Sequence, residues 1–219
     1  MPQETITLPS PSNPALRGRS LLYLPENYRR SRRRWPLLLF LHGADERGDD
    51  LELVKRHGPP SFLDDCRDFP FLVVSPQCPR GKWWPLRSLA ALIDDVCARY
   101  RVDERRICVT GLSMGGYATW ALALLCPQRF AAIAPICGGG DPRRVSRIAH
   151  LPVWAFHGAL DEIVPLDEST RMVQALQQRG AHVKFTVYPD AGHNSWTRTY
   201  DDPEFYEWLL KQRRTDRVP

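Results

Sequence analysis

The stretch that decides the fold is RRICVTGLSMGGYATWALALL, residues 105–125. A run of apolar and β-branched residues leads into Gly-Leu-Ser-Met-Gly, and small apolar residues follow at helical spacing. This pattern predicts a buried strand that turns sharply into a helix, with Ser113 at the turn. Ser113 then has two interpretations: an exposed nucleophile, or a polar residue that caps the helix.

Other short apolar runs have the same character as residues 105–112. WPLLLFLHG, which ends at Gly43, fits a strand buried on both faces of a parallel sheet. The further expected strands are FLVVSP, AAIAPICGGG, PVWAFHG, KFTVYPDAGH and segments near Glu4–Leu8 and Ser20–Leu24. Helical periodicity marks LRSLAALIDDVCARY, YATWALALLC, STRMVQALQQRG and PEFYEWLLKQRR. This alternation of strand and helix predicts one doubly wound, mostly parallel α/β domain over residues 1–219.

Composition argues against several classes of function. The formal net charge is only +5, and its densest part, the basic run Arg29–Arg34, has no interleaved aromatic residues, so no nucleic-acid partner is expected. The six cysteines form no CxxC and no zinc-finger spacing, so no metal site is expected and a reduced, cytoplasmic protein is favoured; the sequence leaves open whether any cysteines pair. No signal-like apolar segment and no membrane-spanning run is expected, and no cofactor motif is found.

Candidate catalytic residues follow the predicted strands, because open parallel sheets bind ligands beyond the carboxyl ends of their strands. Ser113 lies in GLSMG, a match to G-x-S-x-G, and a serine nucleophile requires a base that is itself oriented by an acid. His193, in the loop after the last strand, is the preferred base. The other strand-end histidines are His157, a competitor as base, and His42, which we expect in a turn beside the oxyanion donors.

The preferred acid is Asp161, which lies just beyond the strand PVWAFHG. Its rivals are Asp141, Glu162, Asp167 and Asp190. Two backbone N–H groups are expected to form an oxyanion hole, one from Met114 directly after the serine and one from Ala44 after WPLLLFLHG.

Several residues are candidates for substrate binding or for support of the site. Trp83 and Trp84 either form a binding wall or cover an edge of the core. Glu46 and Arg47 are expected to pair and hold the oxyanion loop. Trp196 is expected to pack against the histidine loop, with lining of the pocket as the less favoured role.

The four motifs LHGADERG, TGLSMGGYATW, FHGALDEIVP and YPDAGHNSW, in this order, resemble the α/β-hydrolase superfamily. More narrowly, they resemble small carboxylesterases and predicted peptidases related to phospholipase/carboxylesterases, polyhydroxybutyrate depolymerases and feruloyl esterases. The resemblance implies an α/β-hydrolase fold, a Ser113–His193–Asp161 triad in the usual chain order, and hydrolysis of carboxylic esters. Asp45 departs from the family pattern, which commonly has Gly there, and adds a carboxylate near the expected acyl pocket. No inter-strand segment is long enough for a cap domain.

Two alternatives to a small-molecule esterase stay open from the sequence. One is a serine peptidase, which the absence of a large N-terminal domain makes less favoured. The other is a non-catalytic α/β-hydrolase that serves as a binding module, against which the complete set Ser113, Asp161 and His193 argues. The sequence leaves the acyl and alcohol specificity and the oligomeric state open.

Overall fold

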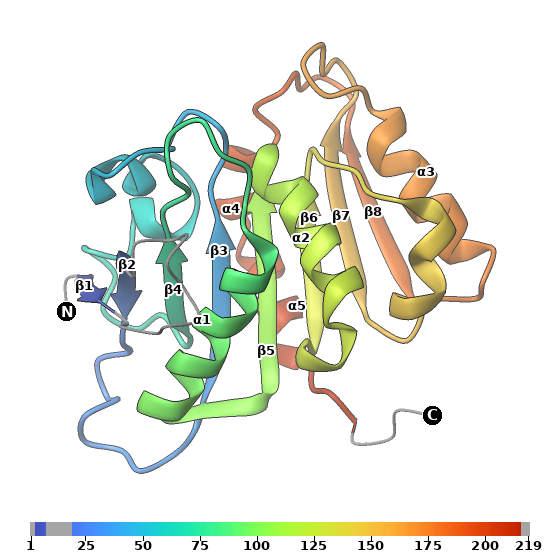
Figure 1. Cartoon of the computed structure of the whole chain (residues 1–219). Helices are drawn as coiled ribbons and strands as arrows, with labels where there is room; N and C mark the ends of the chain where they lie inside the picture. Colours follow the sequence, from blue (N-terminus) through green and yellow to red (C-terminus); the bar gives the residue numbers. More distant parts are fainter. Residues whose placement is uncertain (1–2, 8–18, 216–219) are drawn as a thin grey trace.

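A computed structural model describes residues 3–7 and 19–215, which form one sheet with helices on both faces (Figure 1). Residues 1–2, 8–18 and 216–219 of the predicted domain, including Leu8 at the end of the first expected strand, lie outside the described part. The strands are β1 (Glu4–Thr7), β2 (Arg19–Tyr23), β3 (Trp35–Leu41), β4 (Leu72–Pro76), β5 (Val102–Leu112), β6 (Ala132–Ile136), β7 (Val153–Gly158) and β8 (Val183–Tyr188). The α-helices are α1 (Leu86–Arg99), α2 (Met114–Leu125), α3 (Asp167–Gln177), α4 (Trp196–Tyr200) and α5 (Pro203–Lys211).

The sheet has the strand order β1-β2-β4-β3-β5-β6-β7-β8. β2 pairs antiparallel with β1 and with β4, and the pairs from β4 through β8 are all parallel. The predicted doubly wound, mostly parallel α/β sheet is therefore confirmed. Among the described residues, no segment between strands forms a cap domain.

The two faces of the sheet each carry a hydrophobic core, and β3 contributes to both. Leu37, Leu39 and Leu41 pack into the core under α1, α2 and α3, whereas Leu38 and Phe40 pack into the core under α4 and α5. In Figure 1, α1, α2 and α3 lie in front of the sheet and α4 and α5 behind it. Successive side chains of a strand point to opposite faces of the sheet. Because both faces are covered by helices at β3, this strand requires an uninterrupted apolar run.

The turn between β5 and α2 depends on glycines because backbone atoms crowd around it. A Cβ at Gly115 would lie 1.9 Å from the carbonyl oxygen of Leu41 in β3. A Cβ at Gly116 would lie 2.3 Å from the carbonyl oxygen of Ile136 in β6. The start of α2 therefore sits directly against the ends of two central strands, which no residue with a side chain permits.

Several short elements have no counterpart among the predicted ones. They are α4 and the 3₁₀ helices η2 (Leu51–Arg56), η3 (Pro59–Ser61), η4 (Pro127–Arg129) and η5 (Pro142–Ile148). Their lengths of three to seven residues are too short for a helical period to show in sequence.

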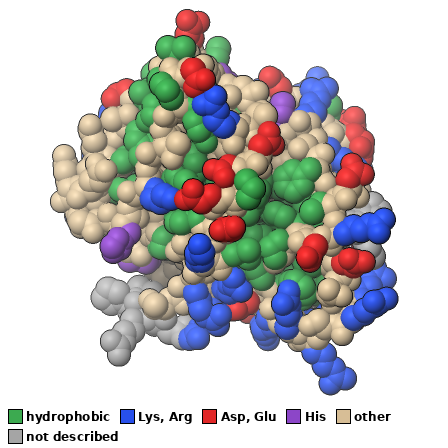
Figure 2. Space-filling model, turned by 180° about the vertical axis from the view of Figure 1, so that it is seen from behind, with side chains coloured by type: hydrophobic (Ala, Val, Ile, Leu, Met, Phe, Trp, Pro, Cys, Tyr) green, Lys and Arg blue, Asp and Glu red, His purple; other side chains and the backbone are tan. Residues whose placement is uncertain are grey.

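The basic run is tied to the fold by several of its side chains. Arg29 pairs with Glu4, the guanidinium of Arg33 lies 3.4 Å above the ring of Trp35, and Arg34 donates to the carbonyl of Val102. On the face shown in Figure 2, basic and acidic side chains are interspersed and no continuous basic stripe is visible. None of the described helices combines the length and apolar character needed to cross a bilayer.

The close approach of α2 to β6 predicts a steep cost for one added methyl group. We expect Gly116→Ala to lower the free energy of unfolding by about 3 kcal/mol or more, because the new Cβ overlaps a backbone atom that cannot move alone. Gly180→Ala is the matched control: its φ is +69° but nothing lies within 4 Å of the added Cβ, so a loss of about 1 kcal/mol is expected. Urea denaturation followed by circular dichroism measures both. Equal losses for the two variants would contradict the packing argument.

Candidate active site

Ser113 joins β5 to α2 in a strained backbone conformation, with φ 53° and ψ −116°. It occupies the N-cap position of α2, but its side chain forms no capping hydrogen bond. Positive φ in a residue other than glycine costs free energy and is concentrated at functional sites. The helix-cap interpretation therefore fails, and the hydroxyl is presented outward from the turn.

The structure brings together the three side chains that the sequence proposes as a triad. The Ser113 hydroxyl donates to His193 Nε2 at 3.0 Å, and His193 Nδ1–H donates to Asp161 Oδ2 at 2.8 Å. This arrangement leaves Nε2 unprotonated and able to take the serine proton. The other Asp161 oxygen, Oδ1, accepts from the N–H groups of Ile163 and Val164, which fixes the carboxylate.

The rival acids and bases lie elsewhere. His157 is fully buried, and its Nε2 donates to the carbonyl of Val164 at 2.9 Å and lies 3.3 Å from Asp161 Oδ2, so it contacts the acid and not Ser113. Two of the rival acids form ion pairs, Asp141 with Arg143 and Asp190 with Arg198. Of the other two, Asp167 is the first residue of α3 and Glu162 is exposed.

The loop after β3 carries the proposed oxyanion donor Ala44 and is held by a buried imidazole. His42 Nε2 accepts from the N–H of Cys78 at 2.9 Å, and its Nδ1–H donates to the carbonyl of Gly43 at 2.6 Å. Burial lowers the pKa of His42 to about 4, so the ring is neutral and holds the loop in place through these two hydrogen bonds. Met114, the other proposed donor, is the first residue of α2, whose N–H has no partner inside the helix.

A pocket of about 250 Å³ opens beside Ser113. It is lined by Gly43, Ala44, Asp45, Glu46, His57, Leu112, Ser113, Ile163, His193 and Trp196. Ala44 and Asp45, both proposed from the sequence, are among these residues. The pocket therefore lies between the loop after β3, the serine turn and the histidine loop.

The two tryptophans proposed as a binding wall do not line this pocket. Trp84 is only 5% exposed; its indole N–H donates to the carbonyl of His42, and its ring lies 4.7 Å from the His42 ring. The binding prediction for Trp84 is therefore wrong, and its core interpretation is correct. Trp83 is 68% exposed and meets the ring of Tyr117, one turn after Ser113, edge-on at 6.3 Å.

Six residues line the pocket without having been proposed as binding residues from the sequence: Gly43, Glu46, His57, Leu112, Ile163 and Trp196. Trp196 packs edge-on against His193 at 5.2 Å, as expected, and also lines the pocket. The expected Glu46–Arg47 pair is not formed, because the Arg47 side chain donates to the carbonyl of Ala44 while Glu46 faces His57. His57 follows a 3₁₀ helix rather than a strand, so no sequence signal marked it.

Comparison with known proteins identifies the family to which this chain belongs. Residues 83–207, more than half of the chain and including the serine, the acid and the base, match the dienelactone hydrolase family. The chain belongs to the dienelactone hydrolase family. The expected α/β-hydrolase superfamily is thus confirmed, and the narrower family is now defined.

Individual relatives agree with this assignment. A protein of Escherichia coli O157:H7 named "Putative carboxymethylenebutenolidase" is 36% identical over 100 residues, which cover 42% of this chain and 37% of the relative. A crystallised thermostable esterase is 34% identical with a TM-score of 0.83, covering 97% of this chain and 63% of the esterase. A feruloyl esterase module of Clostridium thermocellum shares the fold at 17% identity, with a TM-score of 0.70 and coverage of 99% of this chain and 90% of the module.

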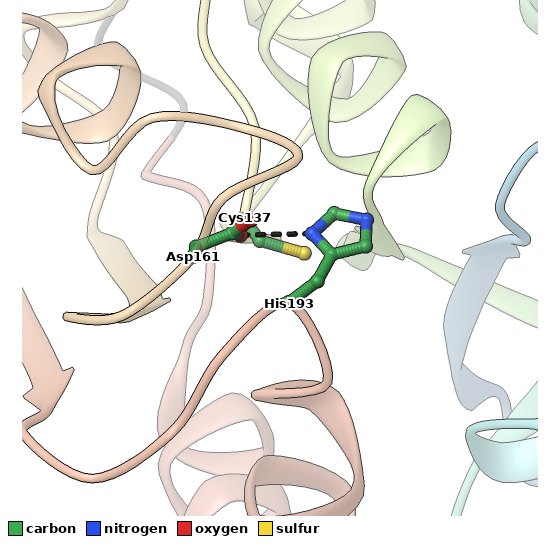
Figure 3. Close-up of side chains that lie close together, drawn as sticks. All are labelled: Cys137, Asp161 and His193. Atoms are coloured by element: carbon green, nitrogen blue, oxygen red, sulfur yellow. Dashed lines mark hydrogen bonds and ion pairs between the residues drawn. The ribbon is translucent and has the colours of Figure 1, made fainter.

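In this member of the dienelactone hydrolase family, Cys137 lies against the acid–base pair (Figure 3). Ligand atoms of Cys137, Asp161 and His193 lie within 4.8 Å of one another, a spacing compatible with a metal ion. Burial raises the pKa of the Cys137 thiol to about 12, and its Sγ accepts from the Ser113 N–H at 3.3 Å. Because Sγ faces the Ser113 N–H while Asp161 and His193 are bonded to each other, we interpret Cys137 as packing beneath the serine turn.

The hydrogen-bond chain predicts how the reactivity of Ser113 changes when the carboxylate of Asp161 is removed. We expect Asp161→Asn to slow labelling of Ser113 by a fluorophosphonate about a thousandfold, because an amide N–H facing His193 Nδ1 favours the tautomer that cannot accept the serine proton. The control is Asp190→Asn, whose exposed carboxylate pairs with Arg198. Labelling is followed by intact-protein mass spectrometry, and equal rates in the two variants would remove Asp161 from the triad.

Proposed function

We propose that this protein is a serine hydrolase that cleaves carboxylic esters, with short-acyl or aryl esters as its substrate class, through an acyl-enzyme. The observation that carries the proposal is the continuous hydrogen-bond chain from Ser113 through His193 to Asp161 beside an open pocket. The names of the similar proteins, a carboxymethylenebutenolidase and a thermostable esterase, support the same reaction class.

In the proposed mechanism, the Ser113 oxygen attacks the ester carbonyl carbon as its proton passes to His193 Nε2. The backbone N–H groups of Ala44 and Met114 stabilise the oxyanion, and Met114 adds the positive end of α2. Imidazolium His193 then protonates the leaving alcohol, and the C–O bond of the ester breaks. The same histidine deprotonates a water that releases the acid and regenerates the serine. Asp161 orients the ring and stabilises its cationic form.

We also infer the cellular compartment and the binding partner of the protein. The six cysteines all remain free, which favours a reducing compartment such as the cytoplasm. The arginines of the basic run have partners within the fold, which favours a structural role over nucleic-acid binding. We propose a small-molecule ester as the partner, a single domain over residues 1–219, and no metal or cofactor in the reaction.

The direct test replaces the nucleophile. We expect Ser113→Ala to lower kcat/KM for p-nitrophenyl acetate by about a thousandfold or more, because the acyl-enzyme cannot form. Ser146→Ala, an exposed serine on η5, serves as the matched control and should keep full activity. More than about a tenth of the activity surviving in Ser113→Ala would refute the assignment.

The same assay separates the competing functions. A panel of p-nitrophenyl, feruloyl, acetyl-sugar and lactone esters is run beside an N-acyl p-nitroanilide as the amide. Faster turnover of the anilide than of the matched ester would favour the peptidase alternative. Folded protein that neither labels with fluorophosphonate nor turns over any ester would favour the binding module.

A further inference from the structure

His157 is a buried imidazole that the proposed mechanism does not use. It lies near the end of β7, four residues before Asp161, and its side chain has no exposed surface. One ring nitrogen, Nδ1, lies 2.7 Å from the hydroxyl oxygen of Ser169 on α3, and the other, Nε2, lies 2.9 Å from the carbonyl oxygen of Val164. Both nitrogens therefore have a hydrogen-bond partner, and these partners decide which nitrogen carries a proton.

The hydrogen-bond partners of His157 require two protons on its ring. A carbonyl oxygen only accepts, so Nε2 carries a hydrogen toward Val164. The Ser169 hydroxyl has a single hydrogen, which it donates to the carbonyl oxygen of Gly138 at 2.8 Å. The same hydroxyl oxygen can then only accept a hydrogen from Nδ1. A neutral ring would leave one of these three short contacts without a hydrogen between its two atoms.

A charged ring without exposed surface is costly unless an opposite charge lies beside it. Asp161 supplies that charge, since its Oδ2 lies 3.3 Å from His157 Nε2 and its side chain is also buried. The same oxygen lies 2.8 Å from His193 Nδ1, the contact drawn in Figure 3. The carboxylate of Asp161 is thus shared between two imidazoles, of which only His193 reaches the serine.

The other elements around His157 bring no further compensating charge to it. Among the residues that the structure describes, Asp161 is the only carboxylate that pairs with the ring. On α3, Glu168 pairs with Arg171, and on β8 the residue in register with His157 is the apolar Val187. The Cys137 thiol at the end of β6 lies within 4.8 Å of the Asp161 carboxylate, and burial raises its pKa to about 12, so it is neutral.

We propose that His157 is a buried imidazolium paired with Asp161, and that its charge sets the pH range in which His193 acts as a base. His157 touches no substrate, so it is a positioning residue that acts through Asp161. Its charge follows from its own contacts, whereas its effect on His193 rests on the proposed triad. A cation on one side of the carboxylate opposes a second cation on the other side. His193 therefore stays unprotonated to a lower pH than it would beside Asp161 alone, and its cation protonates the leaving alcohol more readily.

Nitrogen NMR of protein labelled at its histidines tests the charge directly. In long-range proton–nitrogen spectra near neutral pH, we expect both ring nitrogens of His157 to give the signals of protonated nitrogens. The exposed His150 is the internal reference. The His157 signals are those that vanish in His157→Gln or, where that variant folds poorly, those that move in Ser169→Ala. One protonated and one unprotonated nitrogen would overturn the proposal, whether or not the protein hydrolyses esters.

Two variants test the effect on His193. Ser169→Ala removes the acceptor for His157 Nδ1–H and so favours loss of one proton from the ring, whereas His157→Gln removes the charge outright. In each variant, the acid limb of the pH dependence of kcat/KM for p-nitrophenyl acetate should move to higher pH by about one unit. The reason is that His193 then faces an Asp161 carboxylate whose charge no second imidazolium offsets.

Thr170→Ala is the matched control, because this next residue of α3 has a hydroxyl that donates to the carbonyl of Leu166 and not to the ring. Its acid limb should stay in place. The position of the limb does not depend on the absolute rate, so a partial loss of activity leaves the comparison valid. The rate of Ser113 labelling by a neutral fluorophosphonate over the same pH range gives the limb even if no ester is turned over. A limb that does not move in either test variant would overturn the effect on His193.

Discussion

The packing of the first turn of α2 against the ends of β3 and β6 is the constraint on which the site depends. Gly115 and Gly116 allow this approach, since a Cβ at either position would overlap a strand carbonyl. The approach forces Ser113 into its positive φ, and it aims the free N–H groups at the start of the helix toward the point where the serine oxygen would react. The position of the proposed nucleophile, its backbone strain and the placement of the proposed oxyanion donor Met114 thus follow from the same packing.

The acid and the base are held by a second, independent network at the neighbouring strand ends. Asp161 is fixed by two backbone N–H groups on one oxygen, and its other oxygen faces two imidazoles, His193 and the buried His157. His157 has partners of its own in Val164 and Ser169, so it cannot swing toward the serine. The carboxylate is therefore held on both oxygens, and the more exposed His193 is the ring that lies between it and Ser113.

The parts of this molecule that can be predicted from the sequence are those in which a local sequence pattern is compatible with only one local structure. Continuous apolar runs had to be strands buried on both faces, and glycines around Ser113 had to mark a close backbone approach. Strand ends, together with the Ser…Asp…His chain order of α/β-hydrolases, then pointed to Asp161 and His193. In contrast, His57 and Glu46 reach the pocket through 3₁₀ segments and a loop, where neither periodicity nor strand topology fixes the direction of a side chain. Trp83 and Trp84 show the same limit: adjacent residues of one type point one to solvent and one to the core.

The charge of the pocket illustrates why bulk composition says little about a site. The chain carries a formal net charge of +5, yet the wall beside Ser113 presents Asp45 and Glu46. Burying a carboxylate is costly unless backbone donors or a cation compensate it, and the loop after β3 supplies N–H groups while its arginine is used on the carbonyl of Ala44. The loop that carries the proposed oxyanion donor thus also carries the negative charge. Solvent and salt screen the buried carboxylate of Glu46 little, whereas they screen the surface excess of arginine strongly.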